Sequence, residues 1–385
     1  MIGWKDIYKV VASVVPLYVP LGLGYASVSR WQMFKPDHCD AINRFNCYYI
    51  IPFFAFRFTS SVDPYRMNYR FLAGDVVAKA IAGAVLALWA NLWRRGNFSW
   101  AITSFSLSSL NNTLVVGVPL LQAMYGAVGE DIVVQSFVIQ SLLWFPILIF
   151  MLEIRRSSIK GDHQSQQQQC SIKMTAVTTD NDANVNNIEH EENQDNAGTI
   201  RISSSSPQHG TGSTMMKVWA KLAKNPNCYA SALGLIWALI SKRWSIEMPS
   251  IVEGSVLIMA NAGSGVAMFA MGSGGVVEPP DSELGLFMAL QKKVIACGMR
   301  LSLYGMLLRF VGGPITTTIG SLALGLRSNT LRIAIIQAAL PESLAAFVFA
   351  QEYGLHAEVL GTAVIFGTIV SLPLLIAYYA ILDVI

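Results

Sequence analysis

Two prolines inside apolar stretches are the first residues to consider for chemistry. Pro119 closes the run 111–119 (NNTLVVGVP), and Pro341 stands directly before Glu342 and Ser343. A proline inside a helix removes one backbone hydrogen bond and blocks another. Half-helices that begin at such breaks direct partial positive charge toward a common point, which suits a bound anion. The alternative is a simple proline kink at each position, which membrane helices tolerate.

A second candidate is the pair Asp75 and Lys79, which lies inside another apolar stretch. Their spacing of four residues places both side chains on one face of a helix. Charges inside a membrane are costly and usually face a bundle interior or a transport pathway. The pair could carry a proton or stabilise an empty carrier. The alternative is a structural ion pair near the membrane interface.

No other pattern indicates catalysis or metal binding. The sequence has no G-x-x-x-x-G-K-[ST] loop, so we expect no ATP hydrolysis by this chain. Its five cysteines form no C-x-x-C pair, and its five histidines have no metal-ligand spacing. No serine or cysteine nucleophile has a nearby base in the sequence. We therefore predict a protein that is not an enzyme and that holds no metal or other cofactor.

The elements that position these residues must lie in a membrane. Of the 385 residues, 53% are hydrophobic and only 13% are charged. Soluble domains average about 25% charged residues. The net charge of +3 and the absence of a basic stripe argue against nucleic-acid binding. The composition therefore indicates a multi-pass protein whose main partner is the lipid bilayer.

A helix that spans a bilayer needs about 20 mostly apolar residues. We find ten candidate spans, five on each side of a polar central segment. The candidates are residues 7–28, 38–60, 70–93, 100–126, 131–153, 226–245, 250–290, 294–311, 330–351 and 357–382. The sequence therefore predicts an all-α polytopic protein with ten transmembrane helices.

The central segment, residues 154–216, divides the chain into membrane repeats at 1–153 and 217–385. It contains four consecutive glutamines, a stretch rich in Asn, Asp and Glu, and four consecutive serines. Such a composition cannot bury enough apolar surface to fold alone, so we predict a disordered loop. Lys and Arg flank the loop on both sides, which places it in the cytosol and both termini on the far side of the membrane.

The two halves share a spaced pattern. Each has a Tyr-Gly pair followed, five residues after the tyrosine, by a glutamate, at Glu130 and Glu358. A proline follows 16 residues after the first glutamate and 15 after the second. A five-helix unit repeated after an odd number of crossings must insert upside down, and inverted repeats with broken helices are typical of transporters. The alternative is coincidence among common residues.

Several longer stretches resemble the PIN auxin efflux carriers of land plants. The resemblance covers nearly all of 1–153 and 217–385, and AIIQAALP with TAVIFG is its most specific part. The matching stretches are 42–45 (INRF), 112–119 with Asn112, Gly117 and Pro119, 122–126 (QAMYG), 225–227 (NPN), 286–291 (LFMALQ), 334–341 (AIIQAALP), 347–353 (FVFAQEY) and 362–367 (TAVIFG).

This resemblance implies a five-plus-five inverted repeat with two proline-broken crossing helices, a homodimer, and elevator-type export of the indole-3-acetate anion. It also implies roles for particular residues. The implied substrate contacts are Asn112, Asn227 and Tyr229, with Ile51, Val115 and Gln140 lining the pocket; Asp75 and Lys79 form the support site, and Pro119 and Pro341 are the crossing prolines.

Three features depart from the family pattern. The family usually has proline where this chain has Asn111. After Pro341 it usually reads QGIVP, whereas this chain reads ESLAA and so places Glu342 beside the crossing. A carboxylate there would repel an anionic substrate unless it is protonated or paired. The third departure is residues 273–285, thirteen residues with two prolines and three acids inside the seventh span. We interpret them as an unspliced intron or a gene-model error.

Two classes of function fit these observations. The first is a secondary carrier, either of auxin or of another small organic anion. The second is a non-transporting membrane receptor or scaffold, which the short 63-residue central segment makes less attractive. In the family a short loop goes with the endoplasmic reticulum membrane, which we favour, and the plasma membrane is the alternative.

Deletion of residues 273–285 is expected to preserve or improve folding, because it makes the seventh span continuous. The yield and monodispersity of the deletion variant, compared with the full chain, measure this effect. Sequencing spliced transcripts is the cheapest check, and messages that retain these residues would contradict the gene-model interpretation.

Overall fold

The computed structural model describes residues 4–93, 96–158, 216, 225–273 and 297–384. Most of the predicted central loop, 154–216, and all but Ser273 of the predicted insertion, 273–285, lie outside these residues. The described part is helical and contains no strand; one isolated β-bridge is its only extended pairing. The predicted all-α class is therefore confirmed.

The helices of the first half alternate with short breaks rather than forming uniform rods. They are α1 (Trp4–Ser29), α2 (Pro36–Phe45), α3 (Ile51–Ser61), α4 (Tyr69–Leu92), α5 (Phe98–Ser109), α6 (Val118–Tyr125) and α7 (Ala127–Ile139), with the helix that contains α7 continuing to Ser158. Asn68 and Asn97 cap α4 and α5 by accepting backbone N–H bonds, which fixes where these two helices begin.

The second half repeats this alternation of long and short helices. Its helices are α10 (Pro226–Trp244), α11 (Ser250–Asn261), α12 (Gly263–Gly272), α13 (Met299–Leu307), α14 (Gly313–Ala323), α15 (Ser328–Ala338), α16 (Leu344–Glu352) and α17 (Ala357–Val384). Asn225 caps α10 with its side chain, and a left-handed Ser245 ends that helix.

Four short π-helical segments interrupt the α-helices. They are Asn46–Ile50, Thr113–Gly117, Gln140–Trp144 and Leu308–Gly312. A π-helical turn holds one more residue than an α-turn and often lies at a functional site. Each of the four contains a residue that lines the cavity or the crossing described below.

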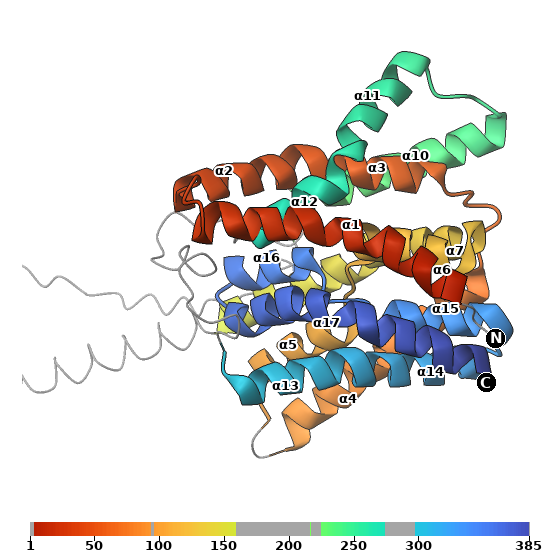
Figure 1. The fold of residues 1–385 in the computed structure, drawn as a ribbon. Helices are drawn as coiled ribbons and strands as arrows, with labels where there is room; N and C mark the ends of the chain where they lie inside the picture. Colours follow the sequence, from red (N-terminus) through yellow and green to blue (C-terminus); the bar gives the residue numbers. More distant parts are fainter. Residues whose placement is uncertain (1–3, 94–95, 159–215, 217–224, 274–296, 385) are drawn as a thin grey trace, which may run out of the picture.

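The helices form two layers, and each layer takes members from both halves of the sequence (Figure 1). In one layer α3 packs along α10 and α11, and α1 packs along α12. In the other, α4 packs against α5 and α14, and α17 against α13 and α16. The first turn of α1 and the last turn of α17 lie at the same end of the bundle (Figure 1). The two halves are thus interleaved and not side by side.

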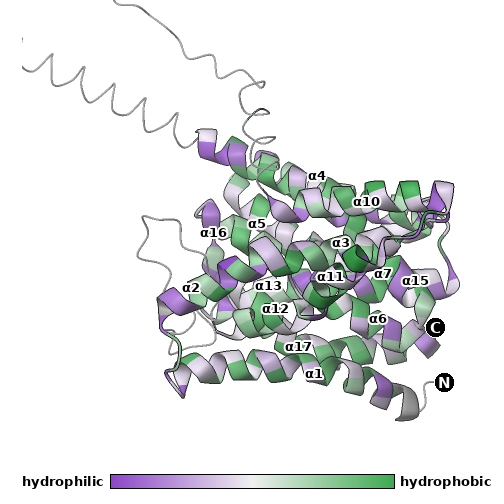
Figure 2. Ribbon diagram, turned by 90° about the horizontal axis from the view of Figure 1, so that it is seen from above, coloured by the Kyte–Doolittle hydropathy of each residue, from purple (hydrophilic) through white to green (hydrophobic). Residues whose placement is uncertain are grey.

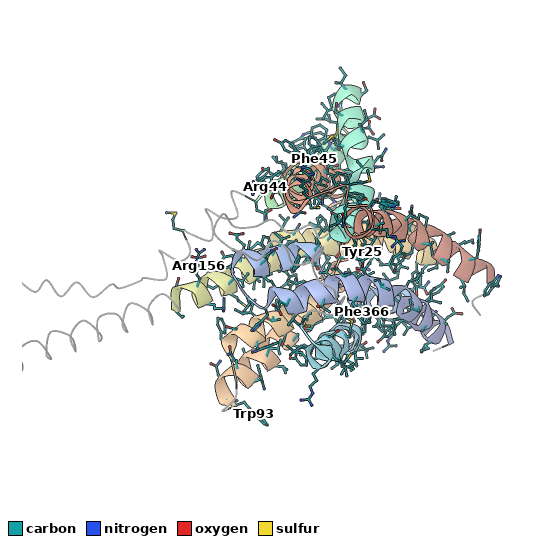
Figure 3. All side chains as sticks on the ribbon, turned by 60° about the vertical axis from the view of Figure 1, so that its left-hand side comes forward. Tyr25, Arg44, Phe45, Trp93, Arg156 and Phe366 are labelled. Carbon is teal, nitrogen blue, oxygen red and sulfur yellow. The ribbon has the colours of Figure 1, made fainter. Side chains whose placement is uncertain are left out.

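The surface of the bundle suits lipid. Five helices of the described part are long and apolar enough to cross a membrane: Ile7–Ser29, Tyr69–Leu92, Ala127–Ser158, Ser250–Gly272 and Ala357–Asp383. Large apolar side chains are exposed along these and other helices, such as Leu88 and Ile315. Figure 2 shows the hydrophilic residues gathered mainly near helix ends, and Figure 3 shows Trp93 and Arg156 at the edge of the bundle.

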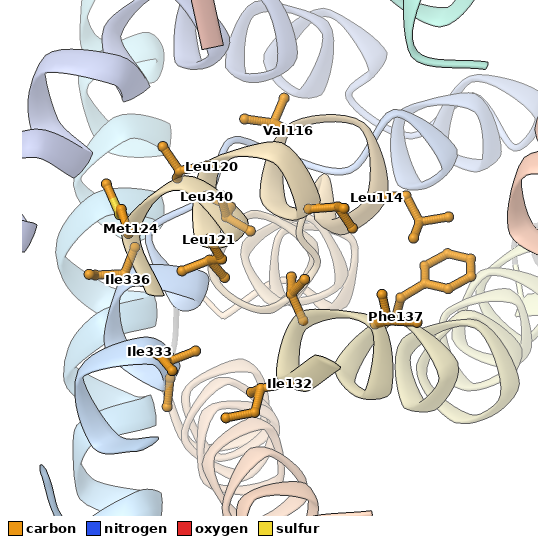
Figure 4. Close-up of a cluster of buried hydrophobic side chains, with 14 of the residues drawn as sticks. Leu114, Val116, Leu120, Leu121, Met124, Ile132, Phe137, Ile333, Ile336 and Leu340 are labelled. Carbon is orange, nitrogen blue, oxygen red and sulfur yellow. The ribbon is translucent and has the colours of Figure 1, made fainter. Parts of the chain in front are cut away.

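The largest apolar core joins segments from both halves (Figure 4). Side chains of the Thr113–Gly117 segment, α6 and α7 pack there against α15. Its labelled members are Leu114, Val116, Leu120, Leu121, Met124, Ile132, Phe137, Ile333, Ile336 and Leu340. Most are less than 8% exposed, so this core fixes the two interrupted helices against each other.

Gly320 sets the close approach of α14 to α4. A Cβ atom at this position would lie 2.7 Å from the backbone N of Ala78 and 2.8 Å from the carbonyl O of Gly74. Gly320→Ala is therefore expected to destabilise the fold by about 1–3 kcal/mol, as over-packed interiors do. Gly254→Ala is the control, because a Cβ there meets nothing within 4 Å. Thermal unfolding in detergent measures both, and equal melting temperatures would contradict the packing argument.

Candidate functional site

Two interrupted helices cross in the middle of the bundle. After α5 ends at Ser109 the chain is non-helical through 110–112, and after α15 a turn at 339–340 leads into a non-helical segment that ends at Ser343. The two segments form an antiparallel bridge between Asn111 and Glu342. The Asn112 N–H donates to the Pro341 carbonyl (2.9 Å), and the Ser343 N–H donates to the Leu110 carbonyl (3.2 Å). Backbone groups freed by each break are thus satisfied by the other, as an apolar environment requires.

The two predicted crossing prolines occupy different places. Pro341 lies in the non-helical segment between α15 and α16, at the break itself. Pro119 lies beyond the other break, in the first turn of α6. The first break falls instead at residues 110–112, in the run SSLNNT. Ser and Asn side chains compete with the helix for backbone partners, which favours a break there.

Arg309 stabilises the crossing from one side. This side chain has no exposed surface and extends from the π-helical segment Leu308–Gly312. Its guanidinium donates to four carbonyls at the C-terminal ends of α5 and α15, and to Asn111 Oδ1. The carbonyl acceptors are Leu107 (3.0 Å), Leu110 (2.9 Å), Ala338 (3.1 Å) and Leu340 (2.5 Å). A cation therefore meets the partial negative charge of both helix ends.

Asn111 takes the place where the family resemblance suggests proline, and its polar groups are fully used. Its N–H donates to Gln140 Oε1 (3.0 Å), and its carbonyl accepts from Gln140 Nε2 (2.7 Å). Its side-chain amide donates to the Gln337 carbonyl (2.9 Å). A proline could not make the first bond, because it has no N–H. The Asn111–Gln140 pairing thus ties the first break to the helix that follows α7.

A cavity of about 520 Å³ lies on the other side of the crossing. Its lining includes the residues that begin three helices: the segment after Asn112, α16 after Ser343, and α10 at Asn225. The remaining wall is largely apolar. Phe54, Phe137, Phe145, Ile149 and Phe349 contribute to it. Helix N-termini carry partial positive charge, so the cavity suits a small ligand with an anionic end and an apolar body.

The cavity brings together five of the six residues predicted to contact or enclose a ligand. These are Ile51, Asn112, Val115, Gln140 and Asn227. The sixth, Tyr229, does not line it and is 47% exposed. The reason is helical geometry, because two residues turn the helix by about 200° and carry Tyr229 to the face opposite Asn227.

Two polar atoms in this wall are buried and have no hydrogen-bond partner among the described residues. They are Asn112 Nδ2, a donor, and Asn227 Oδ1, an acceptor. A buried polar atom without a partner calls for an explanation, and a bound water or ligand is one such explanation. Gln140 differs, since both of its amide atoms already bind Asn111. The cavity wall therefore contains one donor and one acceptor that no described residue satisfies.

The pair Asp75 and Lys79 lies on the opposite side of the crossing from the cavity. Lys79 Nζ is 2.9 Å from Asp75 Oδ2, and both side chains are buried. They line a space of about 10 Å³ together with Ser108 and Gln337, at the C-terminal ends of α5 and α15. The predicted ion pair is thus formed, and it touches the crossing but not the cavity.

Arg309 is not among the residues predicted from the sequence. The sequence could have indicated this residue, because a single arginine in the apolar run 301–311 has a high free-energy cost in a membrane unless it is buried and paired. Its partners could not be found in the same way, since they are backbone carbonyls more than 25 residues away. The described residues contain no group of three or more His, Cys, Asp or Glu side chains that could hold a metal ion.

Interrupted helices that cross beside a cavity, in a bundle with lipid-facing sides, define a membrane transport protein. The family model described as "Membrane transport protein" matches residues 9–279 and 282–379. Auxin efflux carrier component 5 of Arabidopsis thaliana is 49% identical to this chain over 100% of the chain and 99% of the relative.

Two further relatives agree. The probable auxin efflux carrier component 5c of Oryza sativa subsp. japonica is 48% identical over 99% of both chains. Auxin efflux carrier component 8 of Arabidopsis thaliana is 36% identical over 100% of both. The chain therefore belongs to the auxin efflux carrier family, which confirms the resemblance drawn from the sequence motifs.

Proposed function

We propose that this chain is a secondary carrier that exports the auxin indole-3-acetate anion from the cytosol. The observation that carries the proposal is the cavity at three helix N-termini, with its unpaired Asn112 amide. A carboxylate placed there accepts a hydrogen bond from Asn112 Nδ2 and meets the partial positive charge of the helix ends. A neutral ligand of the same shape lacks the attraction to the partial positive charge of the helix ends.

The rest of the ligand fits the rest of the cavity. Indole-3-acetate carries one N–H, which can donate to the unpaired Asn227 Oδ1. Its ring system is flat and apolar and suits the wall formed by Ile51, Phe54 and Val115. The volume of about 520 Å³ lies within the range of about 300–1,000 Å³ that is usual for small-molecule sites. We assign Tyr229 no direct contact, because it is outside this wall.

We propose ten membrane-crossing segments arranged as two inverted five-helix repeats, 1–153 and 217–385. Pairs of consecutive short helices, each too short to cross a membrane alone, support this arrangement because together they are long enough. α2 continues into α3 through a π-helical segment, and α13 continues into α14 in the same way. α5 with α6, and α15 with α16, each form one interrupted membrane span. The antiparallel bridge between Asn111 and Glu342 relates the two interrupted crossings by reversal of direction, as an inverted repeat requires.

An elevator-type movement agrees with the position of the cavity between the two layers. One wall comes from the layer of α3 and α10, through Ile51 and Asn227, and the other from the crossing, through Asn112 and Ser343. A ligand held at such a boundary changes its access when one layer slides against the other. The family resemblance supports a homodimer, and the short segment 154–216 supports the endoplasmic reticulum membrane over the plasma membrane.

Efflux of radiolabelled indole-3-acetate from proteoliposomes that contain the purified chain tests the proposed function. Transport above that of empty liposomes, saturable with substrate, is the expected result. Binding of the auxin without any transport would favour a receptor instead. Transport of other organic anions but not of indole-3-acetate would keep the carrier class and reject this substrate.

Asn112→Ala is expected to reduce indole-3-acetate transport at least tenfold without loss of folded protein. The substitution removes a hydrogen bond to a charged group, which contributes about 1.5–3 kcal/mol. Asn91→Ala is the matched control, because Asn91 is exposed on α4 and bonds only the Ala87 carbonyl in its own helix. Transport rates like those of the unmodified chain in Asn112→Ala would remove this residue from the site.

Asp75→Asn is expected to slow transport more than it weakens binding. The pair lies across the crossing from the cavity, so the ligand does not contact it. Loss of the carboxylate leaves the Lys79 ammonium buried and unpaired, which costs several kcal/mol. This free-energy cost should differ between the inward-facing and outward-facing states of the carrier. Binding and transport measured side by side decide the matter, with Asp63→Asn in the α3–α4 loop as control. Equal loss of both would place Asp75 in the binding site.

A further inference from the structure

Glu342 belongs to a second buried ion pair that the proposed transport cycle does not use. Its carboxylate lies 3.5 Å from Arg309 Nη1, and neither side chain has exposed surface. Ser106 Oγ donates to the other carboxylate oxygen (2.8 Å). The next residue, Ser343, lines the cavity, whereas Glu342 does not. The carboxylate therefore lies beside the ligand cavity but points away from it, into the crossing.

The guanidinium beside this carboxylate favours its ionised form. One carboxylate oxygen accepts from Ser106 Oγ, and the other lies 3.5 Å from Arg309 Nη1 as an ion-pair contact without a hydrogen bond. An arginine side chain keeps its charge when it is buried. An opposite charge this close favours the ionised carboxylate, because the two charges attract strongly where water is absent. As the partner of Arg309 in this ion pair, Glu342 adds a negative charge to the crossing.

Arg309 does not need that charge for its own hydrogen bonds. Its donors bind four carbonyls and Asn111 Oδ1, and the C-terminal ends of α5 and α15 together supply about one negative charge. Glu342 is therefore an additional charge, and it lowers the positive potential that the crossing presents to the cavity behind it. Any anion in the cavity experiences this reduction.

We propose that Glu342 is a specificity-determining residue, which weakens binding of an anionic ligand relative to a neutral ligand of the same shape. The inference rests on the proposed function, because it takes the 520 Å³ cavity as the ligand site. Weaker binding favours release after each transport step. At an effective dielectric constant of about 20, one unit charge about 10 Å away changes the affinity for an anion on the order of tenfold.

Glu342→Gln tests the proposal, because it removes the charge and keeps the size and the acceptor oxygen. The full chain is purified in detergent at neutral pH, and equilibrium binding is measured for indole-3-acetate and for neutral indole-3-acetamide. The variant is expected to bind the anion about tenfold more tightly and the amide within about twofold of the unmodified chain. Glu342→Asp, which keeps the charge, should not tighten binding of the anion.

Two further variants make the result decisive. Glu342→Met is a second neutral replacement and should tighten binding of the anion in the same way. Glu253→Gln, on the exposed first turn of α11, controls for the loss of a carboxylate elsewhere and should change neither affinity.

Three outcomes would overturn the inference. One is anion affinity in Glu342→Gln equal to that of the unmodified chain, and another is an equal gain for the anion and the amide. The third is loss of monodisperse protein in both neutral variants, which would make the pair a structural requirement of the crossing. Failure of the unmodified chain to bind indole-3-acetate would instead reject the proposed function, so the two failures are distinguishable.

Discussion

The structure depends on how backbone polar groups are satisfied where two helices are broken inside an apolar bundle. Each break frees N–H and C=O groups that lipid cannot bind, and each such group costs several kcal/mol if left alone. The bridge between Asn111 and Glu342 pairs some of them, and the Arg309 guanidinium binds four of the carbonyls. With these bonds in place the chain can expose helix ends at mid-bundle without losing its fold.

That arrangement divides the crossing into two electrostatic sides. The C-terminal helix ends face Arg309, Lys79 and Asp75, while the N-terminal ends face the cavity. The cations Arg309 and Lys79 therefore lie where helix ends are negative, and the ligand cavity lies where helix ends are positive. An anion needs no lysine or arginine in direct contact under these conditions, and the cavity wall contains neither.

The sequence predicted those features that are local. A spacing of four residues placed Asp75 beside Lys79, and the break at Pro341 follows from the missing proline N–H. Features that depend on the partner helix were not predictable. The face on which Tyr229 lies depends on where α10 begins, and the carbonyls that bind Arg309 lie on two helices distant in sequence. The Ser-Asn run, rather than Pro119, breaks the first helix, because tertiary contacts of Asn111 hold the extended conformation.

The π-helical segments imply an unequal tolerance to mutation along this chain. Gln140 and Arg309 both lie in such segments, and so does the start of the helix that follows Asn112. A π-turn accommodates one residue more than an α-turn, so removal of one residue there restores an α-turn and leaves the helix faces beyond it nearly unrotated. Removal of one residue from a regular α-helix instead rotates every later side chain by about 100°. A single-codon deletion should therefore disturb the bundle less within these four segments than in the α-helices that flank them.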